Sequence, residues 1–391
     1  MRTFRCDKCG NTLFFENDTC LRCSSKVGFR ADDLTMTTVE RARDEGIAPC
    51  RNWTDLNACN WFATGDTAQG TGYCPACSTD EVVPDLRDPQ RLALWTETER
   101  AKRRLVYTLL ELRLPLRPSA VKHGLRFRLL ADERVETGAV EPPAQGAVVI
   151  GHEEGQLTMN VVEADDAHRE AMRKRLNEPY RTMLGHLRHE VGHYYWYRLV
   201  ENTELVEDFR ALFGDERADY AAALAAHYER GSTDGWQESF VSSYASAHPW
   251  EDFAETWAHY IHIVDTLETA NDAWLGLAGR AISAPLPLAA ERPFSEMLAD
   301  WLPLAVALNQ LNRSMGMRDA YPFSLTDRVV DKLAFVHRVC RDTGAHPTRR
   351  SHGNSEQRGD RGPRSPAVPA HLVSELDRNP LEERRPEGGA R

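Results

Sequence analysis

A short histidine-containing segment carries the strongest chemical signal in this chain. His189, Glu190 and His193 stand in the order His-Glu-x-x-His. On a helix, residues four apart lie one turn above each other, so the two imidazoles can hold one ion while the Glu190 carboxylate reaches the water bound to it. The chemistry that this spacing indicates is metal-assisted hydrolysis with zinc as the metal.

The surrounding sequence predicts the helix that this chemistry needs. Apolar residues recur at three- and four-residue spacing between residues 181 and 200, the pattern of a partly buried helix. Gly192 stands inside this helix, where glycine costs about 1 kcal/mol relative to alanine. We therefore expect that something needs the room there. The alternative interpretation is a solvated helix whose histidines are incidental.

A catalytic zinc ion needs a third protein ligand and an open position for water. The astacin and matrix-protease pattern would place a histidine at position 199, but that residue is Leu199, so this class is excluded. Downstream, Pro249 suits the first turn of a helix. Glu251 and Glu255 lie one turn apart on it, so one carboxylate can bind the metal while the other braces a histidine ligand.

Eight of the nine cysteines precede residue 78 and fall into two sets of four. The first set has two Cys-x-x-Cys pairs, which is the spacing of a tetrahedral zinc-thiolate site. The second set has one tight pair and one looser pair, so its grouping stays open. A disulfide framework is the rival for both sets. The sets are Cys6, Cys9, Cys20 and Cys23, and then Cys50, Cys59, Cys74 and Cys77.

Together, these motifs resemble a gluzincin peptidase, in which His-Glu-x-x-His is followed by a distal glutamate. The sequence Glu-Asp-Phe-Ala-Glu, which begins at Glu251, is similar to the third-ligand segment of the anthrax lethal factor type. That resemblance implies that Glu251 binds zinc, that Glu255 supports the site and that Tyr244 stabilises the oxyanion. From Cys6 to about Arg341, the chain also resembles a bacterial family of zinc-binding metallopeptidases with an N-terminal zinc ribbon.

The sequence predicts an α+β fold that is mostly α, with a zincin-like domain, a small antiparallel-rich sheet and a preceding zinc ribbon. The predicted parts are a zinc-ribbon domain at 1–80, a metallopeptidase domain at 90–343 and a disordered tail at 344–391, which has few apolar residues. Periodicity predicts strands at 127–130, 147–150 and 157–162. It predicts helices at 90–112, 181–200, 215–229, 249–270, 295–312 and 326–341.

Composition limits the partners and the location. Lysine and arginine number 48 against 59 aspartate and glutamate, a net charge of −11, which disfavours nucleic acid as the main partner. No apolar run approaches the length of a membrane span, so we expect no membrane partner. The first residues lack an apolar secretion core, which predicts a cytoplasmic location. The expected partners are a peptide or protein substrate and a protein that docks on the zinc ribbon.

The sequence therefore predicts a zinc metallopeptidase. His189, His193 and Glu251 would hold one catalytic zinc ion, Glu190 would act as the general base, and the cysteines would hold up to two structural zinc ions. His259 lies about 12 Å along the same helix from Glu251, too far to share that ion. The alternative function is a catalytically inactive scaffold that binds partners through its ribbons.

Overall fold

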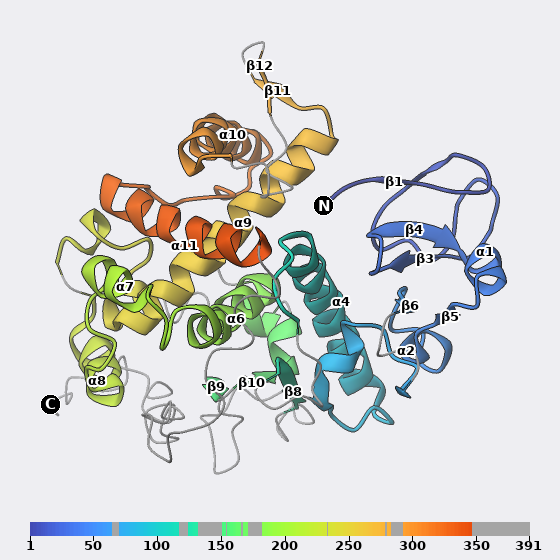
Figure 1. The fold of residues 1–391 in the computed structure, drawn as a ribbon, viewed down its shortest axis with the longest axis horizontal. Helices are drawn as coiled ribbons and strands as arrows, with labels where there is room; N and C mark the ends of the chain where they lie inside the picture. Colours follow the sequence, from blue (N-terminus) through green and yellow to red (C-terminus); the bar gives the residue numbers. More distant parts are fainter. Residues whose placement is uncertain are drawn as a thin grey trace, which may run out of the picture.

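The molecule is mostly helical, and its strands form small sheets (Figure 1). The predicted α+β class is confirmed. In the parts of the chain described below, no helix is both long and apolar enough to cross a membrane. This computed structural model describes residues 1–64, 70–116, 124–131, 151–153, 155–165, 167–170, 182–232, 234–277, 280–282 and 292–345. The predicted strand at 147–150 and the predicted tail at 344–391 lie outside these residues, except for 344 and 345.

The described residues of the N-terminal part form three antiparallel strand pairs and two short helices. Its core centres on Phe29 and Trp61, which are fully buried and whose ring centroids lie 4.6 Å apart. Isolated hairpins of this size are marginally stable, so this part needs additional stabilisation. The elements are β1 Phe4–Arg5, β2 Thr12–Leu13, β3 Val27–Arg30, β4 Thr35–Thr38, α1 Val39–Asp44, β5 Ala48–Pro49, α2 Arg51–Thr54 and β6 Phe62–Ala63.

A four-stranded sheet has the order β7-β8-β10-β9. The expectation of an antiparallel-rich sheet is wrong, because β7 and β8 pair in parallel, as do β8 and β10, and only β9 and β10 are antiparallel. The chain between β8 and β10 is long enough for the crossover that a parallel pair requires. The strands are β7 Asp80–Val82, β8 Arg126–Leu130, β9 Gly151–Glu153 and β10 Gln156–Asn160.

Seven longer helices build the rest of the described chain. Their positions agree with the predicted ones except in two places. Residues 206–213 form a helix that the sequence did not predict, and the helix expected from 215 begins at Tyr220, because the side chain of Asp219 caps its first turn. The helices are α4 Pro89–Glu111, α6 Met183–Leu199, α7 Val206–Phe213, α8 Tyr220–Arg230, α9 Pro249–Asp272, α10 Phe294–Ser314 and α11 Asp327–Ala345.

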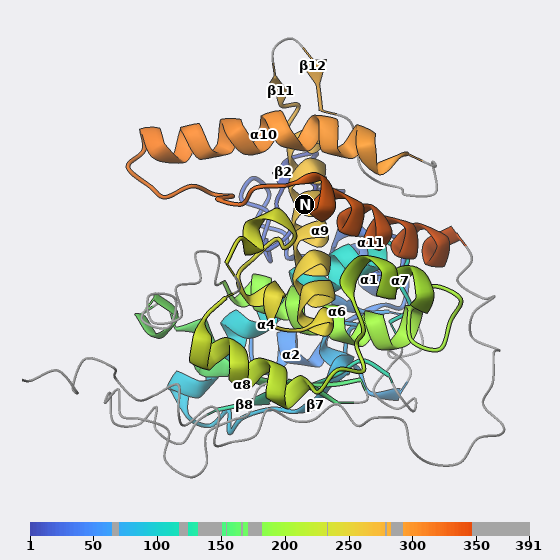
Figure 2. The same ribbon diagram turned by 90° about the vertical axis from the view of Figure 1, so that its left-hand side faces the viewer.

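Helix α9 runs through the centre of the helical part and packs most extensively against α6 (Figures 1 and 2). Gly192 of α6 lies at their closest approach. A Cβ atom added there would lie 2.9 Å from the Cα of Ala254 and 3.2 Å from the Cβ of Trp257. The sequence expectation of crowding at this glycine is therefore confirmed.

Gly192→Ala should destabilise the protein, although the same change in an open helix stabilises it. Overpacking a tight contact costs about 1–3 kcal/mol, which exceeds the helix-propensity gain of about 1 kcal/mol. Thermal unfolding of the variant and the wild type measures the difference. Gly70→Ala is the control, because a Cβ atom there meets open space. An unchanged or higher Tm for Gly192→Ala would contradict the close packing.

Helix α4 belongs to two hydrophobic cores at once. Trp95, Leu105 and Leu109 lie in the main helical core. Val106 and Tyr107, on the opposite side, lie in the core of the N-terminal part. Figure 1 shows α4 between the N-terminal strands and α6. The two parts of the chain therefore pack against the same helix.

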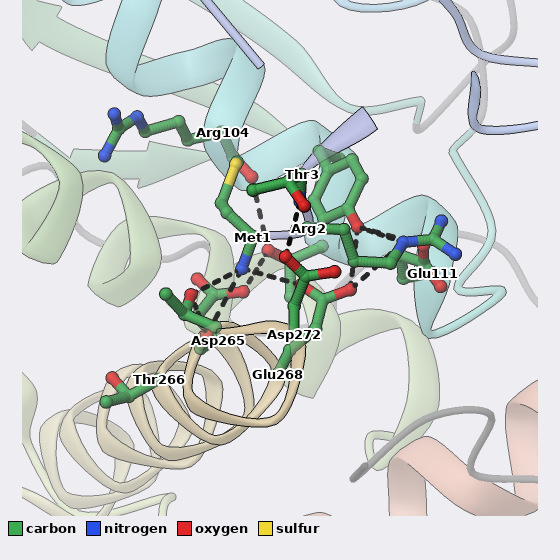
Figure 3. Close-up of polar contacts among 12 residues, drawn as sticks. Met1, Arg2, Thr3, Arg104, Glu111, Asp265, Thr266, Glu268 and Asp272 are labelled. Atoms are coloured by element: carbon green, nitrogen blue, oxygen red, sulfur yellow. Dashed lines mark hydrogen bonds and ion pairs between the residues drawn. The ribbon is translucent and has the colours of Figure 1, made fainter. Parts of the chain in front are cut away.

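The first three residues add polar contacts to this junction (Figure 3). The Met1 ammonium lies 2.8 Å from the Glu268 carboxylate of α9, and the backbone N–H of Thr3 donates to Asp272 at 2.8 Å. Arg2 donates to the Tyr107 hydroxyl of α4 at 3.1 Å, and Tyr107 in turn donates to Glu268 at 2.7 Å. The N-terminal segment thus contacts both α4 and the C-terminal half of α9.

Candidate metal centre

The starts of α6 and α9 fix the positions of the candidate metal ligands. Thr182 caps α6, since its hydroxyl accepts from the Gly185 N–H at 2.9 Å. The His248 imidazole caps α9 by accepting from the Trp250 N–H at 3.1 Å, and Pro249 occupies the first helical position. Glu251 therefore lies in the first turn of α9, where the helix dipole favours a negative charge.

His189, His193 and Glu251 come together as a buried cluster whose candidate ligand atoms all lie within 4.8 Å of one another. The Oε2 atom of Glu251 lies 3.0 Å from Nε2 of His189 and 3.5 Å from Nε2 of His193. That oxygen is buried, yet the contacts do not have hydrogen-bond geometry. A buried carboxylate oxygen needs a partner. Two imidazole nitrogens and one carboxylate oxygen are a donor set that fits zinc.

Glu255 contacts the opposite side of the His189 ring. Nδ1 of His189 donates to Oε1 of Glu255 at 2.7 Å, while the Ser242 hydroxyl donates to Oε2 at 2.5 Å. With Nδ1 protonated, the lone pair of His189 is on Nε2, which faces Glu251. A carboxylate behind a metal-binding histidine fixes the ring tautomer and orientation in this way.

The cluster is held together by opposite charges. Burial alone would raise the pKa of Glu251, but the neighbouring His193 and His189 lower it well below its usual value. Burial would lower the pKa of His189, but Glu251 and Glu255 raise it well above its usual value. Positive charge at this position is therefore strongly favoured. A divalent cation would supply that charge in place of the protons.

Glu190 and Tyr244 lie beside the cluster. Glu190 is buried, and its Oε2 atom has no hydrogen-bond partner among the described residues. Tyr244 begins a short 3₁₀ helix at Tyr244–Ala247, and its ring centroid lies 5.9 Å from that of His189. Burial and the nearby Glu251 charge raise the pKa of Tyr244 well above its usual value, so its hydroxyl stays protonated and can donate.

The two cysteine sets form two compact clusters, each with candidate ligand atoms within 4.8 Å. In the first, Sγ of Cys9 lies 3.6 Å from Sγ of Cys20. In the second, Sγ of Cys59 lies 3.9 Å from Sγ of Cys74. The widely spaced pair Cys50 and Cys59 therefore belongs to one cluster with the close pair Cys74 and Cys77. Four sulfurs around zinc at about 2.3 Å lie about 3.8 Å apart, and a disulfide requires about 2.05 Å. All nine thiols are free.

The second cluster touches the helical part of the molecule directly. The Cys77 sulfur lies 3.6 Å from the Glu99 carboxylate of α4, and the buried Lys102 pairs with Glu99 at 2.6 Å. Arg103, also buried, donates to the Ala58 carbonyl at 2.8 Å. Four thiolates around one zinc ion carry a net negative charge, and Arg103 lies where it can balance it, whereas Lys102 pairs with the buried carboxylates of Asp80 and Glu99.

Both the N-terminal part and the helical part of the chain match known protein families. Residues 91–339 match the family described as "Putative zinc-binding metallo-peptidase", and residues 3–88 match a zinc-ribbon domain. The chain belongs to this metallopeptidase family. Its predicted resemblance is thus confirmed at the level of the family and of the N-terminal ribbon.

Relatives of this chain occur in mycobacteria. Proteins of Mycobacterium tuberculosis and Mycobacterium bovis, each named only as uncharacterized, are 43% identical over 342 residues. The alignment covers 87% of this chain and 95% of each relative. No solved structure matches the chain significantly.

Two other histidines of α9 lie apart from the cluster, as expected. His259 is buried, and its Nδ1 atom lies 2.8 Å from the Tyr321 hydroxyl. The His262 ring packs against Trp301, with centroids 5.8 Å apart. Both side chains belong to the packing between α9 and the segment around α10.

Tyr220 is a site residue that the sequence analysis missed. This first residue of α8 donates its hydroxyl to Oε1 of Glu251 at 2.5 Å, while Oε2 of the same carboxylate faces the two histidines. The contact holds Glu251 with one oxygen toward the histidines. Tyr220 lies 31 positions before Glu251, and no spacing rule links them, so only the fold of α8 against the start of α9 reveals the pair.

Tyr220→Phe should weaken zinc binding at the histidine cluster by about 10- to 100-fold, which is the usual cost of losing a partner that orients a metal ligand. Competition with a chelator, with the cysteine sites kept loaded, measures this affinity. Tyr260→Phe on α9 is the matched control, since it removes a buried hydroxyl that lies 3.1 Å from Nδ1 of His337 and contacts no candidate ligand in the described part of the chain. Equal zinc affinity in both variants would show that Tyr220 does not orient Glu251.

Proposed function

We propose that this chain is a zinc-dependent peptidase that hydrolyses peptide bonds with Glu190 as general base. The observation that carries the proposal is the buried Glu190 carboxylate beside the cluster of His189, His193 and Glu251, with one oxygen that no described residue contacts by a hydrogen bond. In this proposal those three residues hold the catalytic zinc ion, and Glu255 braces His189. The family assignment supports the same chemistry.

A zinc ion in this site would lower the pKa of a water molecule towards about 7 and polarise the carbonyl of the substrate. Glu190 accepts a proton from that water through its free Oε2 atom as the water oxygen bonds to the carbonyl carbon. The C–N bond then breaks, and Glu190 delivers the proton to the leaving amine. The Tyr244 hydroxyl donates a hydrogen bond to the carbonyl oxygen as negative charge develops there, a contribution worth about 3 kcal/mol for one donor.

The test is cleavage of an unbiased peptide library by the full, zinc-loaded protein. Hydrolysis in water enriched in ¹⁸O should place the label in the new carboxyl termini, because the attacking oxygen comes from solvent. A chelator that empties the histidine cluster should stop cleavage, and added zinc should restore it. Bound zinc without cleavage of any peptide would instead favour the inactive scaffold.

The proposal also predicts how many zinc ions each chain contains. With both cysteine clusters and the histidine cluster filled, each chain should contain three zinc ions, two of them structural. Elemental analysis of the purified protein gives this number. The cysteine-bound ions should resist a chelator longer, because four thiolates enclose them and the proposed catalytic ion keeps an open position. A content of one zinc ion or fewer, with cysteines oxidised in pairs, would contradict the ribbon assignment.

A further inference from the structure

A buried chain of three ionisable side chains leads away from the proposed base. His186 lies on α6 one turn before Glu190, and its Nε2 atom is 3.3 Å from Oε1 of Glu190. On the other side of the ring, Nδ1 lies 2.5 Å from Oε2 of Glu163. Glu163 belongs to the 3₁₀ helix Val161–Ala164, which follows strand β10. The sheet and α6 are thus joined through this imidazole.

The two oxygens of Glu190 are in different situations. Oε1 faces His186, whereas Oε2 is buried and has no hydrogen-bond partner in the part of the chain that the structure describes. The side chains of Glu163 and Glu190 are only 7% and 8% exposed, and that of His186 is 17% exposed. Water therefore has little access to hold the carboxylate in place. Without His186, Glu190 could rotate about its terminal bond, which has a broad, two-fold torsional preference.

We propose that His186, anchored by Glu163, is a positioning residue that holds one oxygen of Glu190 and leaves the other free to accept the proton from water. This inference rests on the proposed peptidase function. A general base must lie within hydrogen-bond reach of the proton that it removes. Holding the carboxylate in advance removes the cost of orienting it during the reaction.

The charge state of the imidazole agrees with this arrangement. In the described parts of the chain, the ionisable groups that contact His186 are Glu163 from the 3₁₀ helix and Glu190 from α6. Burial would lower the pKa of His186, but these two carboxylates raise it to about 9. At neutral pH the ring therefore carries both N–H groups, donates to Glu163 and forms an ion pair with Glu190. The doubly protonated ring is held by an acid on each side.

The kinetic test compares three substitutions of His186 that remove different contacts. His186→Gln keeps an N–H donor at about the distance of Nε2, while His186→Asn ends near Nδ1 and loses contact with Glu190. His186→Leu keeps bulk and loses both. We expect kcat to fall by about 10- to 100-fold in the Asn and Leu variants, with KM and zinc content unchanged, and to recover largely in the Gln variant. Equal kcat in wild type and the Leu variant, or equal losses in all three, would overturn the proposal.

A second readout does not depend on peptidase activity. In ¹⁵N NMR spectra of the full protein, the imidazole signal that is lost in His186→Gln should remain that of a doubly protonated ring at pH 7.5. Glu163→Gln and Glu190→Gln should each lower its titration midpoint towards the ordinary value for histidine of about 6.5. His259, whose pKa burial lowers to about 4, serves as a neutral reference in the same spectra.

The two readouts separate the possible failures. If no peptide is cleaved by wild type, the peptidase function fails whatever the NMR spectra show. If wild type is active but the His186 ring is neutral at pH 7.5, the positioning role fails alone. It also fails alone if the titration midpoint of His186 is the same in Glu190→Gln as in wild type. Should His186→Leu not fold, the Gln and Asn variants and the wild-type spectra still decide.

Discussion

Replacing Glu190 with glutamine should lower turnover of any peptide substrate by about 10²- to 10⁴-fold, the usual contribution of a general base. The amide has nearly the same shape as the carboxylate but cannot accept the proton from water. Because Glu190 is not among the residues proposed to hold the metal, zinc content and Tm should stay close to those of wild type. Steady-state kinetics, elemental analysis and thermal unfolding measure these quantities.

Glu207→Gln is the matched control for this substitution. It makes the same chemical change on α7, at a side chain that is 76% exposed and pairs with Arg210 on the surface. Its turnover should equal that of wild type. Full activity in Glu190→Gln would contradict the proposed mechanism, whereas loss of zinc from that variant would show that Glu190 binds the metal.

Glu251→Ala should abolish tight zinc binding at the histidine cluster, while Glu255→Ala should weaken it by about 10- to 100-fold. The expectation follows from the contacts. Glu251 places Oε2 near Nε2 of both histidines, whereas Glu255 reaches only Nδ1 of His189. Removing Glu251 deletes one of the three proposed ligands, and removing Glu255 leaves all three in place but frees the His189 ring to turn.

Zinc affinity in both variants is best measured by competition with a chelator, under conditions that keep the cysteine sites filled. The unfolding temperature of each loaded variant shows whether the fold survives. If Glu255→Ala empties the site and Glu251→Ala leaves it filled, the two roles are exchanged. Equal losses would mean that both carboxylates bind the ion.

The features that the sequence predicted depend on local spacing. His189 and His193 meet because they are one helical turn apart, and the glycine between them indicated that something needs room there, which in the structure is helix α9. Helix spacing placed Glu251 and Glu255 on one face of one helix but could not distinguish them, and the choice of Glu251 as the ligand rested on the family resemblance. The difference between them arises from the direction in which α6 crosses α9, and periodicity contains no information on that crossing.

The features that the sequence did not predict depend on distant parts of the chain. Tyr220 reaches Glu251 from α8, and Glu163 reaches His186 from the end of the sheet. The sequence does place His186 next to Glu190, because the two residues are one helical turn apart. The role of His186 becomes visible only when its contact with Glu163 is known. The parallel pairing of β8 and β10 was missed for a similar reason, since strand direction is set by the crossover and not by the strands.

The sharing of α4 between two cores bears on how this protein could be divided or recombined. Family boundaries suggest a cut near residue 90, as though the ribbon were an interchangeable module. Such a cut would expose Val106 and Tyr107 to water, and it would leave Lys102 without Asp80 and Arg103 without the thiolates beside it. The ribbon and the peptidase domain should therefore be inherited, and should unfold, as one unit. A hybrid with another ribbon would need a matching α4 surface.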